Sequence, residues 1–197
     1  MPVPALEAAL ARVDAASLAR DVAALVQVPS VTGDERAALE RLGELAVRLG
    51  LRAELHRHDL AELRARPDHP GEEAPRDGLW GLTVAVPGAH AGGPRLALNG
   101  HVDVVPEGAA PWRHGGPWSG ATADGCVWGR GSADMKGGIV SALHALAALG
   151  GRAPYGEVVL VAVGSEEDGG LGTFAALERD ARFDACLIPE PTGFDVV

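Results

Sequence analysis

Short runs of almost entirely apolar residues constrain the fold of this chain most strongly. Residues 82–86 read LTVAV and residues 158–163 read VVLVAV, so polar and apolar side chains do not alternate along either run. A strand with one wet face alternates, whereas an unbroken apolar run is typical of a strand covered by helices on both faces. Segments with helical spacing of apolar residues separate these runs. The pattern predicts an α/β fold.

The expected elements follow from periodicity and from helix start and stop signals. Residues 5–27 have apolar side chains at helical spacing, and Pro29 ends that helix. The segment 32–35 (TGDE) predicts a capping box that starts a second helix, which ends at Gly50. Strands are expected at 51–58, 80–86, 95–99, 157–163 and 184–188, helices at 135–149 and 173–181, and a surface loop at 66–78.

Composition narrows the class of protein. A chain of 197 residues that is 47% hydrophobic predicts one globular domain over residues 1–197. Its net charge of -10, from 17 basic and 27 acidic residues, argues against binding to nucleic acid or anionic membranes. No signal peptide pattern or bilayer-length apolar run is visible, so a cytoplasmic protein is expected. Cys126 and Cys186 are interpreted as reduced core thiols.

Chemically active side chains follow the apolar runs where the expected strands end. They are His101 and Asp103 after the strand at 95–99, Glu166 and Glu167 after 157–163, Glu190 after 184–188, and Asp134 at a loop-to-helix junction. In open α/β sheets, ligands bind outside the carboxyl ends of the strands. We therefore expect these side chains to converge on one crevice.

Few kinds of chemistry suit a crevice with these side chains. Five carboxylates and one imidazole would repel strongly unless cations neutralised them. Imidazole with carboxylate suits zinc, with cobalt or manganese as alternatives, and a carboxylate can bridge two metals about 3.5–4 Å apart. His101 and Asp103 leave the same face of an extended segment, so Asp103 can hold the imidazole. Glu166 and Glu167 diverge, so one can bind metal while the other meets water.

Other polar residues have simpler interpretations. His56 and His58 lie in polar stretches and are expected on the surface. His144 falls within a helix, where packing or solvent contact is expected. Lys136 is interpreted only as the start of the helix at 135–149.

Four segments, taken together, resemble a known family. They are residues 100–106 (GHVDVVP), 129–138 (GRGSADMKGG), 165–170 (SEEDGG) and 190–192 (EPT). In this order and spacing they are similar to the family of acetylornithine deacetylase, succinyl-diaminopimelate desuccinylase, aminoacylase and carboxypeptidase G. The similarity extends over nearly the whole chain. It implies a three-layer, zinc-exopeptidase-like catalytic domain with a largely parallel, mixed sheet. It also implies two zinc ions, with cobalt as an alternative.

The resemblance also implies which residues bind the metals. Asp134 would bridge the two zinc ions. His101 and Glu190 would complete one site, and Glu167 would bind the other zinc.

Two further roles come from the same resemblance. Glu166 would be the general base that takes a proton from the attacking water and returns it to the departing amine. Asp103 would orient His101. The family further implies a cis peptide bond between Asp134 and Met135.

The family implies a longer protein than this chain. Residues 1–197 would be the N-terminal portion of the catalytic domain, truncated before a lid and dimerisation domain and a C-terminal return segment. Full-length relatives would form homodimers through that missing domain. The return segment would supply a histidine to the second zinc site, so that site is expected to be incomplete and activity weak.

The activity that the resemblance implies is hydrolysis of an amide in a small N-acyl amino acid or related amine, most like the activity of acetylornithine deacetylase. A dipeptidase or carboxypeptidase of the same family is the neighbouring alternative. A different class of explanation is a non-catalytic remnant, or one half of a split enzyme, that retains metal binding.

Overall fold

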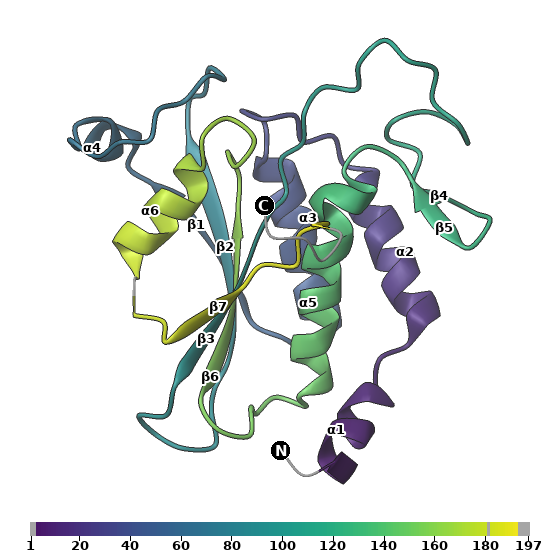
Figure 1. The fold of residues 1–197 in the computed structure, drawn as a ribbon, viewed down its shortest axis with the longest axis vertical. Coiled ribbons are helices and arrows are strands. Elements are labelled where there is room, and N and C mark those ends of the chain that lie inside the picture. Colours follow the sequence, from purple (N-terminus) through teal and green to yellow (C-terminus); the bar gives the residue numbers. More distant parts are fainter. Residues whose placement is uncertain (1–2, 181, 193–197) are drawn as a thin grey trace.

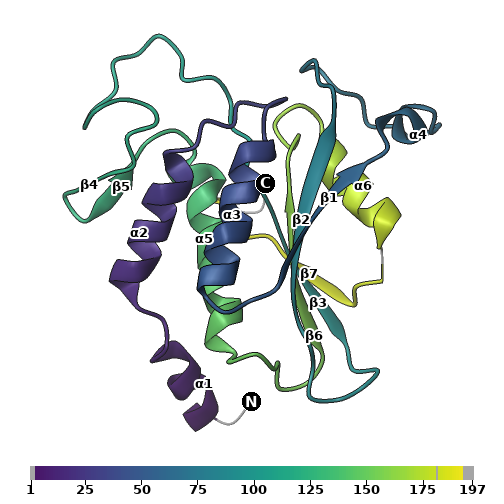
Figure 2. The same ribbon diagram turned by 180° about the vertical axis from the view of Figure 1, so that it is seen from behind.

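The computed structural model describes residues 3–180 and 182–192, which form three layers (Figure 1). A five-stranded sheet lies in the middle, and helices cover both of its faces. Helices α2 (Ala15–Val26), α3 (Arg36–Arg48) and α5 (Gly137–Ala148) lie on one side, and α6 (Leu171–Arg179) lies on the other, as Figure 2 shows from behind. Coverage of both faces explains why the central strands are apolar along their length. The predicted three-layer α/β class is confirmed.

The sheet is mixed, with strand order β1-β2-β6-β3-β7. Its strands are β1 (Ala53–His58), β2 (Leu79–Val86), β6 (Glu157–Val163), β3 (Arg95–His101) and β7 (Ala185–Leu187). The pairings β1 with β2 and β2 with β6 are antiparallel, whereas β3 pairs in parallel with both β6 and β7. The three parallel strands therefore end at the same edge of the sheet.

The main core lies between the sheet and the helices α2, α3 and α5. Leu25, Leu42, Leu143 and Leu160 each expose 1% or less of their surface there. A smaller cluster around Val161 packs on the opposite face under α6. Burial on this scale, at roughly 25 cal/mol per Å² of apolar surface, is the main stabilising contribution to the fold.

The N-terminal region differs from its prediction in two ways. The helix expected at 5–27 is divided into α1 (Val3–Leu10) and α2, because the Asp14 side chain accepts a hydrogen bond from the backbone of Ser17 and starts a new helix. The predicted capping box at residues 32–35 is not formed, so that prediction was wrong. Glu35 precedes α3, but its carboxylate accepts from the nearby Gly33 N–H at 2.7 Å and provides no side-chain cap.

Short elements were also missed. Helix α4 (Leu60–Arg64) follows β1, with the Asp59 side chain accepting from the backbone of Ala61 and Glu62. A hairpin of β4 (Ala121–Ala123) and β5 (Cys126–Trp128) lies beyond α2. Each contains five residues or fewer, too short for periodicity to reveal.

The interpretation of the cysteines as core thiols was wrong. Cys126 lies on the hairpin strand β5 and Cys186 on the edge strand β7, and both are free and exposed. Within residues 3–180 and 182–192, no helix is both long enough and apolar enough to cross a membrane.

Candidate active site

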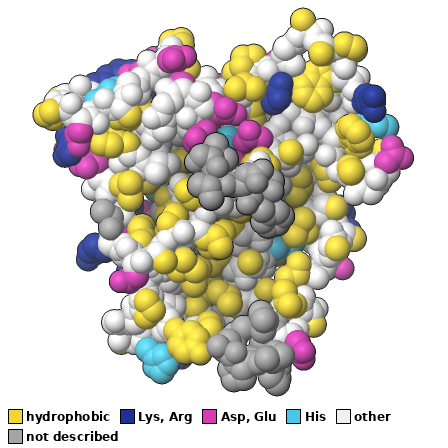
Figure 3. Space-filling model, viewed as in Figure 1, with side chains coloured by type: hydrophobic (Ala, Val, Ile, Leu, Met, Phe, Trp, Pro, Cys, Tyr) yellow, Lys and Arg dark blue, Asp and Glu magenta, His cyan; other side chains and the backbone are white. Residues whose placement is uncertain are grey.

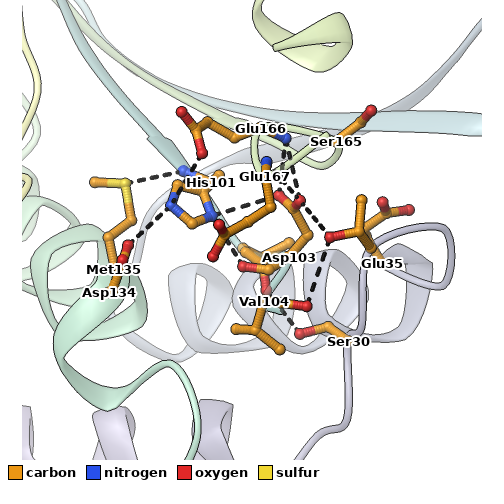
Figure 4. A network of polar contacts seen from close by, with 12 residues as sticks. Ser30, Glu35, His101, Asp103, Val104, Asp134, Met135, Ser165, Glu166 and Glu167 are labelled. Carbon is orange, nitrogen blue, oxygen red and sulfur yellow. Dashed lines mark hydrogen bonds and ion pairs between the residues drawn. The ribbon is translucent and has the colours of Figure 1, made fainter. Parts of the chain in front are cut away.

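The predicted site residues come together where the parallel strands end. His101 is the last residue of β3, the turn 164–170 follows β6, and Glu190 comes three residues after β7. Asp134 lies in the turn Ser132–Lys136 that leads into α5. Figure 4 shows Asp134 and the turn with Glu166 and Glu167 meeting around the imidazole of His101. In the space-filling view of Figure 3, acidic side chains flank a histidine on the upper part of the face.

His101 is the centre of this arrangement. Its side chain is 1% exposed, and its Nε2 atom lies 3.3 Å from Asp134 Oδ1 and 3.3 Å from Glu190 Oε1. Glu166 Oε2 lies 3.8 Å from the same nitrogen. One ligand atom from each of His101, Asp134 and Glu190 lies within 4.8 Å of the other two, so the three could hold one metal ion. We call these three residues the donor group.

The other imidazole nitrogen is held by Asp103. His101 Nδ1 lies 2.9 Å from the backbone carbonyl oxygen of Asp103 and 3.4 Å from its carboxylate. Burial lowers the pKa of His101, but the contacts with Asp103 and the charge of Glu190 outweigh it and raise that pKa to about 9. The backbone carbonyl of Asp103 is therefore nearer to Nδ1 than its carboxylate is, whereas the sequence predicted contact with the carboxylate. Because Nδ1 bonds to this carbonyl, Nε2 is the ring nitrogen that faces the carboxylates of Asp134 and Glu190.

The Asp103 carboxylate has a contact set that the sequence did not reveal. It accepts hydrogen bonds from the backbone N–H groups of Glu166 and Glu167 at 3.1–3.2 Å. Thr32 Oγ1, which follows α2 along the chain, donates to it at 3.0 Å. Asp103 is fully buried. One carboxylate therefore fixes the backbone of both glutamates relative to the strand that carries His101.

Two carboxylates of the site are electrostatically crowded. Burial raises the pKa of Glu167, and the nearby charge of Asp134 raises it further. Burial likewise raises the pKa of Glu190, with Asp134 and Glu166 adding to the rise against the lowering effect of His101. A bound cation would relieve this repulsion. The donor group of one imidazole and two carboxylates has the chemistry that zinc accepts.

Glu167 is the one predicted ligand that lies outside the donor group. Its carboxylate is half-buried and is close enough to Asp134 to be perturbed by it. It belongs to no group of three or more donors among the residues that the structure describes. A second metal between Asp134 and Glu167 would have only two protein ligands here.

The segment around Asp134 is packed beneath His101. The peptide bond between Asp134 and Met135 is cis, as the resemblance implied. Met135 is fully buried, and its sulfur accepts from the His101 backbone N–H at 3.2 Å. A side chain at Gly100 would place its Cβ 2.6 Å from the Met135 methyl carbon, so a larger residue there would require the buried methionine side chain to move.

Lys136 does more than begin a helix. Its side chain is fully buried, and its Nζ donates to the carbonyl oxygens of Leu25 at 3.3 Å and Val28 at 2.9 Å, at the end of α2. Burial lowers the pKa of Lys136 to about 8. The ammonium group thus ties the turn that carries Asp134 to the first helix of the core.

With this geometry established, comparison with known proteins decides the family. A family model described as peptidase family M20/M25/M40 matches residues 97–197, the half of the chain that contains the whole donor group. The chain belongs to this family.

Individual relatives agree with that assignment. Succinyl-diaminopimelate desuccinylase from Rhodopseudomonas palustris strain BisA53 is 39% identical over 192 residues, and the match covers 92% of this chain and 44% of the relative. The enzyme of the same name from Methylobacterium radiotolerans is 38% identical, with coverage of 86% and 41%. This M20-family chain therefore spans less than half the length of the curated relatives it matches.

A solved structure supports the fold. The di-peptidase Dug1p from Saccharomyces cerevisiae superposes with a TM-score of 0.69 at 22% identity, covering 93% of this chain and 40% of that one. At this identity the likeness establishes the fold and leaves the substrate open.

Proposed function

We propose that this chain is the metal-binding part of a zinc-dependent hydrolase that cleaves the amide bond of a small N-acyl amino acid. The observation that carries the proposal is the donor group, in which a buried imidazole faces two carboxylates at 3.3 Å. The desuccinylase relatives, at 37–39% identity, favour an N-succinyl group over other acyl groups. A dipeptide substrate is the second candidate, supported by fold alone.

The residues present fit two unequal metal sites. His101, Asp134 and Glu190 would hold one zinc, and Asp134 with Glu167 would hold another. Zinc polarises an amide carbonyl and makes a water molecule a better nucleophile near neutral pH. Three protein ligands are typical of a catalytic zinc site, whereas two give a much weaker one. We therefore expect this chain to bind one zinc ion far more tightly than a second.

Glu166 is the proposed general base. Its carboxylate is half exposed to solvent and lies 3.8 Å from His101 Nε2, so it borders the donor group without belonging to it. Its backbone is fixed by Asp103. Glu166 would take a proton from the attacking water as the oxygen bonds to the acyl carbon, and would give that proton to the amine nitrogen as the C–N bond breaks.

Zinc titration by calorimetry tests the metal-binding part of the proposal. The wild-type chain should bind one zinc tightly, and Glu190→Gln should weaken that site by more than the ~10–100-fold that loss of an outer hydrogen-bond partner costs. Glu178→Gln, on the exposed face of α6, is the matched control and should change nothing. Two equally tight sites, or a tight site that survives Glu190→Gln, would contradict it.

The substrate is tested in the same preparations. Hydrolysis of an N-succinyl amino acid, an N-acetyl amino acid and a dipeptide is measured with and without the downstream segment that the relatives have. The proposal predicts cleavage of the N-succinyl compound in preference to the others, and faster cleavage with the downstream segment present. Preference for the dipeptide would support the second candidate, and zinc binding without any hydrolysis would support a non-catalytic remnant.

A further inference from the structure

The turn 164–170 carries both glutamates of the site and is held on its inner side by Asp103. In addition to the two bonds from the glutamate amides to Asp103, the N–H groups of Gly169 and Gly170 donate to the carbonyl oxygen of Glu166 at 3.1 Å. Ser165 is buried and has a φ of 60°, in the left-handed region that a serine rarely adopts. A backbone in such a conformation needs support from its surroundings.

The outer side of the turn is anchored through Asp168. Its carboxylate accepts from Ser165 Oγ within the turn, and from the backbone N–H groups of Glu73 and Ala74 at 3.2 and 3.0 Å. The guanidinium of Arg76 donates to it at 2.8 Å. Burial raises the pKa of Asp168, but the Ser165 hydroxyl, the two amides and Arg76 outweigh it and lower that pKa. The charged carboxylate thus connects the turn to the loop 65–78.

Arg76 is an unusual residue for a loop. Its side chain is 0% exposed, and its second Nη atom donates to Glu35 at 3.2 Å. Its Nε atom has no hydrogen-bond partner among the residues that the structure describes, and it lies 3.4 Å from the carboxylate of Glu72. A guanidinium buried among three carboxylates is held in one orientation by its planar fork. Removing it would leave buried carboxylates unpaired.

Glu35 brings this network against the start of the same turn. The Glu35 carboxylate is 4% exposed, and a Cβ added at Gly164 would lie 2.7 Å from Glu35 Cγ. Glu35 therefore packs directly on the backbone where β6 ends and the turn begins. Arg76 joins the two contacts, with Glu35 at one end of the turn and Asp168 near the other.

We propose that Arg76 is a positioning residue, which holds the turn 164–170 so that Glu166 and Glu167 face the donor group. Arg76 acts through Asp168 and Glu35 and contacts neither glutamate. The inference rests on the proposed function for the roles of the two glutamates. It predicts that the loop 65–78, which the sequence indicated only as a surface excursion, is required for the second metal site.

Arg76→Met tests the proposal, with Arg66→Met as the matched control. Arg66 lies in the same loop, and its guanidinium is 40% exposed and paired with Asp68 and Glu178, away from the turn. Two measurements are compared with the wild-type chain. One is amide hydrogen exchange of residues 164–170, and the other is zinc titration of the tight and the weak site.

In Arg76→Met, the amides of Glu166 and Glu167 should exchange roughly tenfold faster, while β3 and β6 keep their protection. The weak zinc site should lose at least about tenfold in affinity, as loss of an outer-shell partner does, and the tight site should change less than about twofold. Arg66→Met should match the wild type in every measurement. Unchanged exchange in the turn, or equal weakening of both zinc sites, would overturn the proposal.

Asp168→Asn keeps the test decisive if Arg76→Met does not fold. The amide oxygen of asparagine can still accept from the backbone of Glu73 and Ala74, but the charge that Arg76 binds is lost. The same selective loosening of the turn is expected, and loss of protection across the whole sheet would show a purely structural role and refute positioning. A wild-type chain that binds no zinc, combined with selective loosening of the turn in the variants, would reject the proposed function and leave the positioning by Arg76 intact.

Discussion

Lys136 illustrates at the scale of one residue how a buried charge can be part of the framework of a site. It is the only lysine of the chain. Burial disfavours its charged form, whereas the hydrogen bonds from its ammonium group to two carbonyl oxygens and the nearby charge of Asp103 favour that form. The Leu25 carbonyl lies in the last turn of α2 and also accepts from the Val28 N–H, whereas Val28 follows the helix. The lysine therefore adds hydrogen bonds where the chain leaves α2.

Lys136→Met is expected to lower the free energy of unfolding by about 1–3 kcal/mol, because the carbonyls of Leu25 and Val28 lose their donor in a buried place. Urea unfolding of the metal-free chain measures the change. Arg20→Met, at an exposed position on α2, is the control and should stay within about 0.5 kcal/mol of the wild type. Equal stability of Lys136→Met and the wild type would show that the hydrogen bonds merely offset the cost of burying the charge.

The donor group could be predicted from sequence because each member lies at the end or the start of an element that periodicity reveals. His101 and Glu190 follow apolar strands, and Asp134 precedes a long helix, so the topology of a parallel sheet brings them together. Arg76 and Lys136 could not be assigned in this way. Their partners lie 92 and 108 residues away in loops and helix ends, and no local pattern connects such positions.

At the scale of elements, β1 differs from its prediction most clearly in its histidines. His56 and His58 were expected on the surface, but they are half-buried on one face of the strand, with ring centroids 4.9 Å apart. His56 Nε2 lies 2.6 Å and His58 Nε2 lies 3.0 Å from where a side chain at Gly81 would begin. Burial, with contributions from His56 and Arg179, lowers the pKa of His58 to about 4.

This environment makes the stability of the sheet dependent on pH. The folded pKa of His58, about 4, is below the ordinary value of 6.5, so the unfolded chain binds its proton first as the pH falls. The stabilising contribution is complete above pH 6.5 and is lost as the pH falls from there toward 4. With allowance for partial exposure, the loss between pH 7 and pH 5 is about 1 kcal/mol.

His58→Gln should therefore lose less stability than the wild type between pH 7 and pH 5. Urea unfolding at the two pH values measures this difference, and other titrating groups cancel because they are common to both proteins. His90→Gln, which removes an exposed imidazole, is the control. If the free energy of unfolding of the wild type and of His58→Gln falls by the same amount between pH 7 and pH 5, the pKa of His58 is not lowered by folding.

At the scale of the whole molecule, the order of strands could be predicted only in part. The apolar runs that became β2, β3 and β6 indicate their burial, and β3 with β6 is parallel as expected. The antiparallel placement of β2 between β1 and β6 depends on the path of the loop 65–78, which carries no periodic signal. The buried ion pairs of Arg76 anchor that path. The same contacts therefore support both the placement of β2 in the sheet and the turn that carries Glu166 and Glu167.

The parallel side of the sheet ends in an apolar edge. The strand β7 is the last in the sheet order, and its three residues are exposed. Leu187 is 52% exposed, and the adjacent Ile188 is 55% exposed. Figure 3 shows a broad area of hydrophobic side chains on this face, below the acidic cluster. An exposed apolar edge of this kind has unpaired backbone groups that can pair with another strand.

We therefore expect the isolated chain to self-associate through β7. Leu187→Lys should shift the chain toward monomer, because a charged side chain on an edge strand opposes pairing with a second copy. Sedimentation velocity over a series of protein concentrations measures the distribution. Val47→Lys, at a 65% exposed apolar position on helix α3, adds the same charge away from the edge strand and should leave the distribution as in the wild type. Equal effects of the two substitutions would mean that net charge, and not the edge of the sheet, controls association.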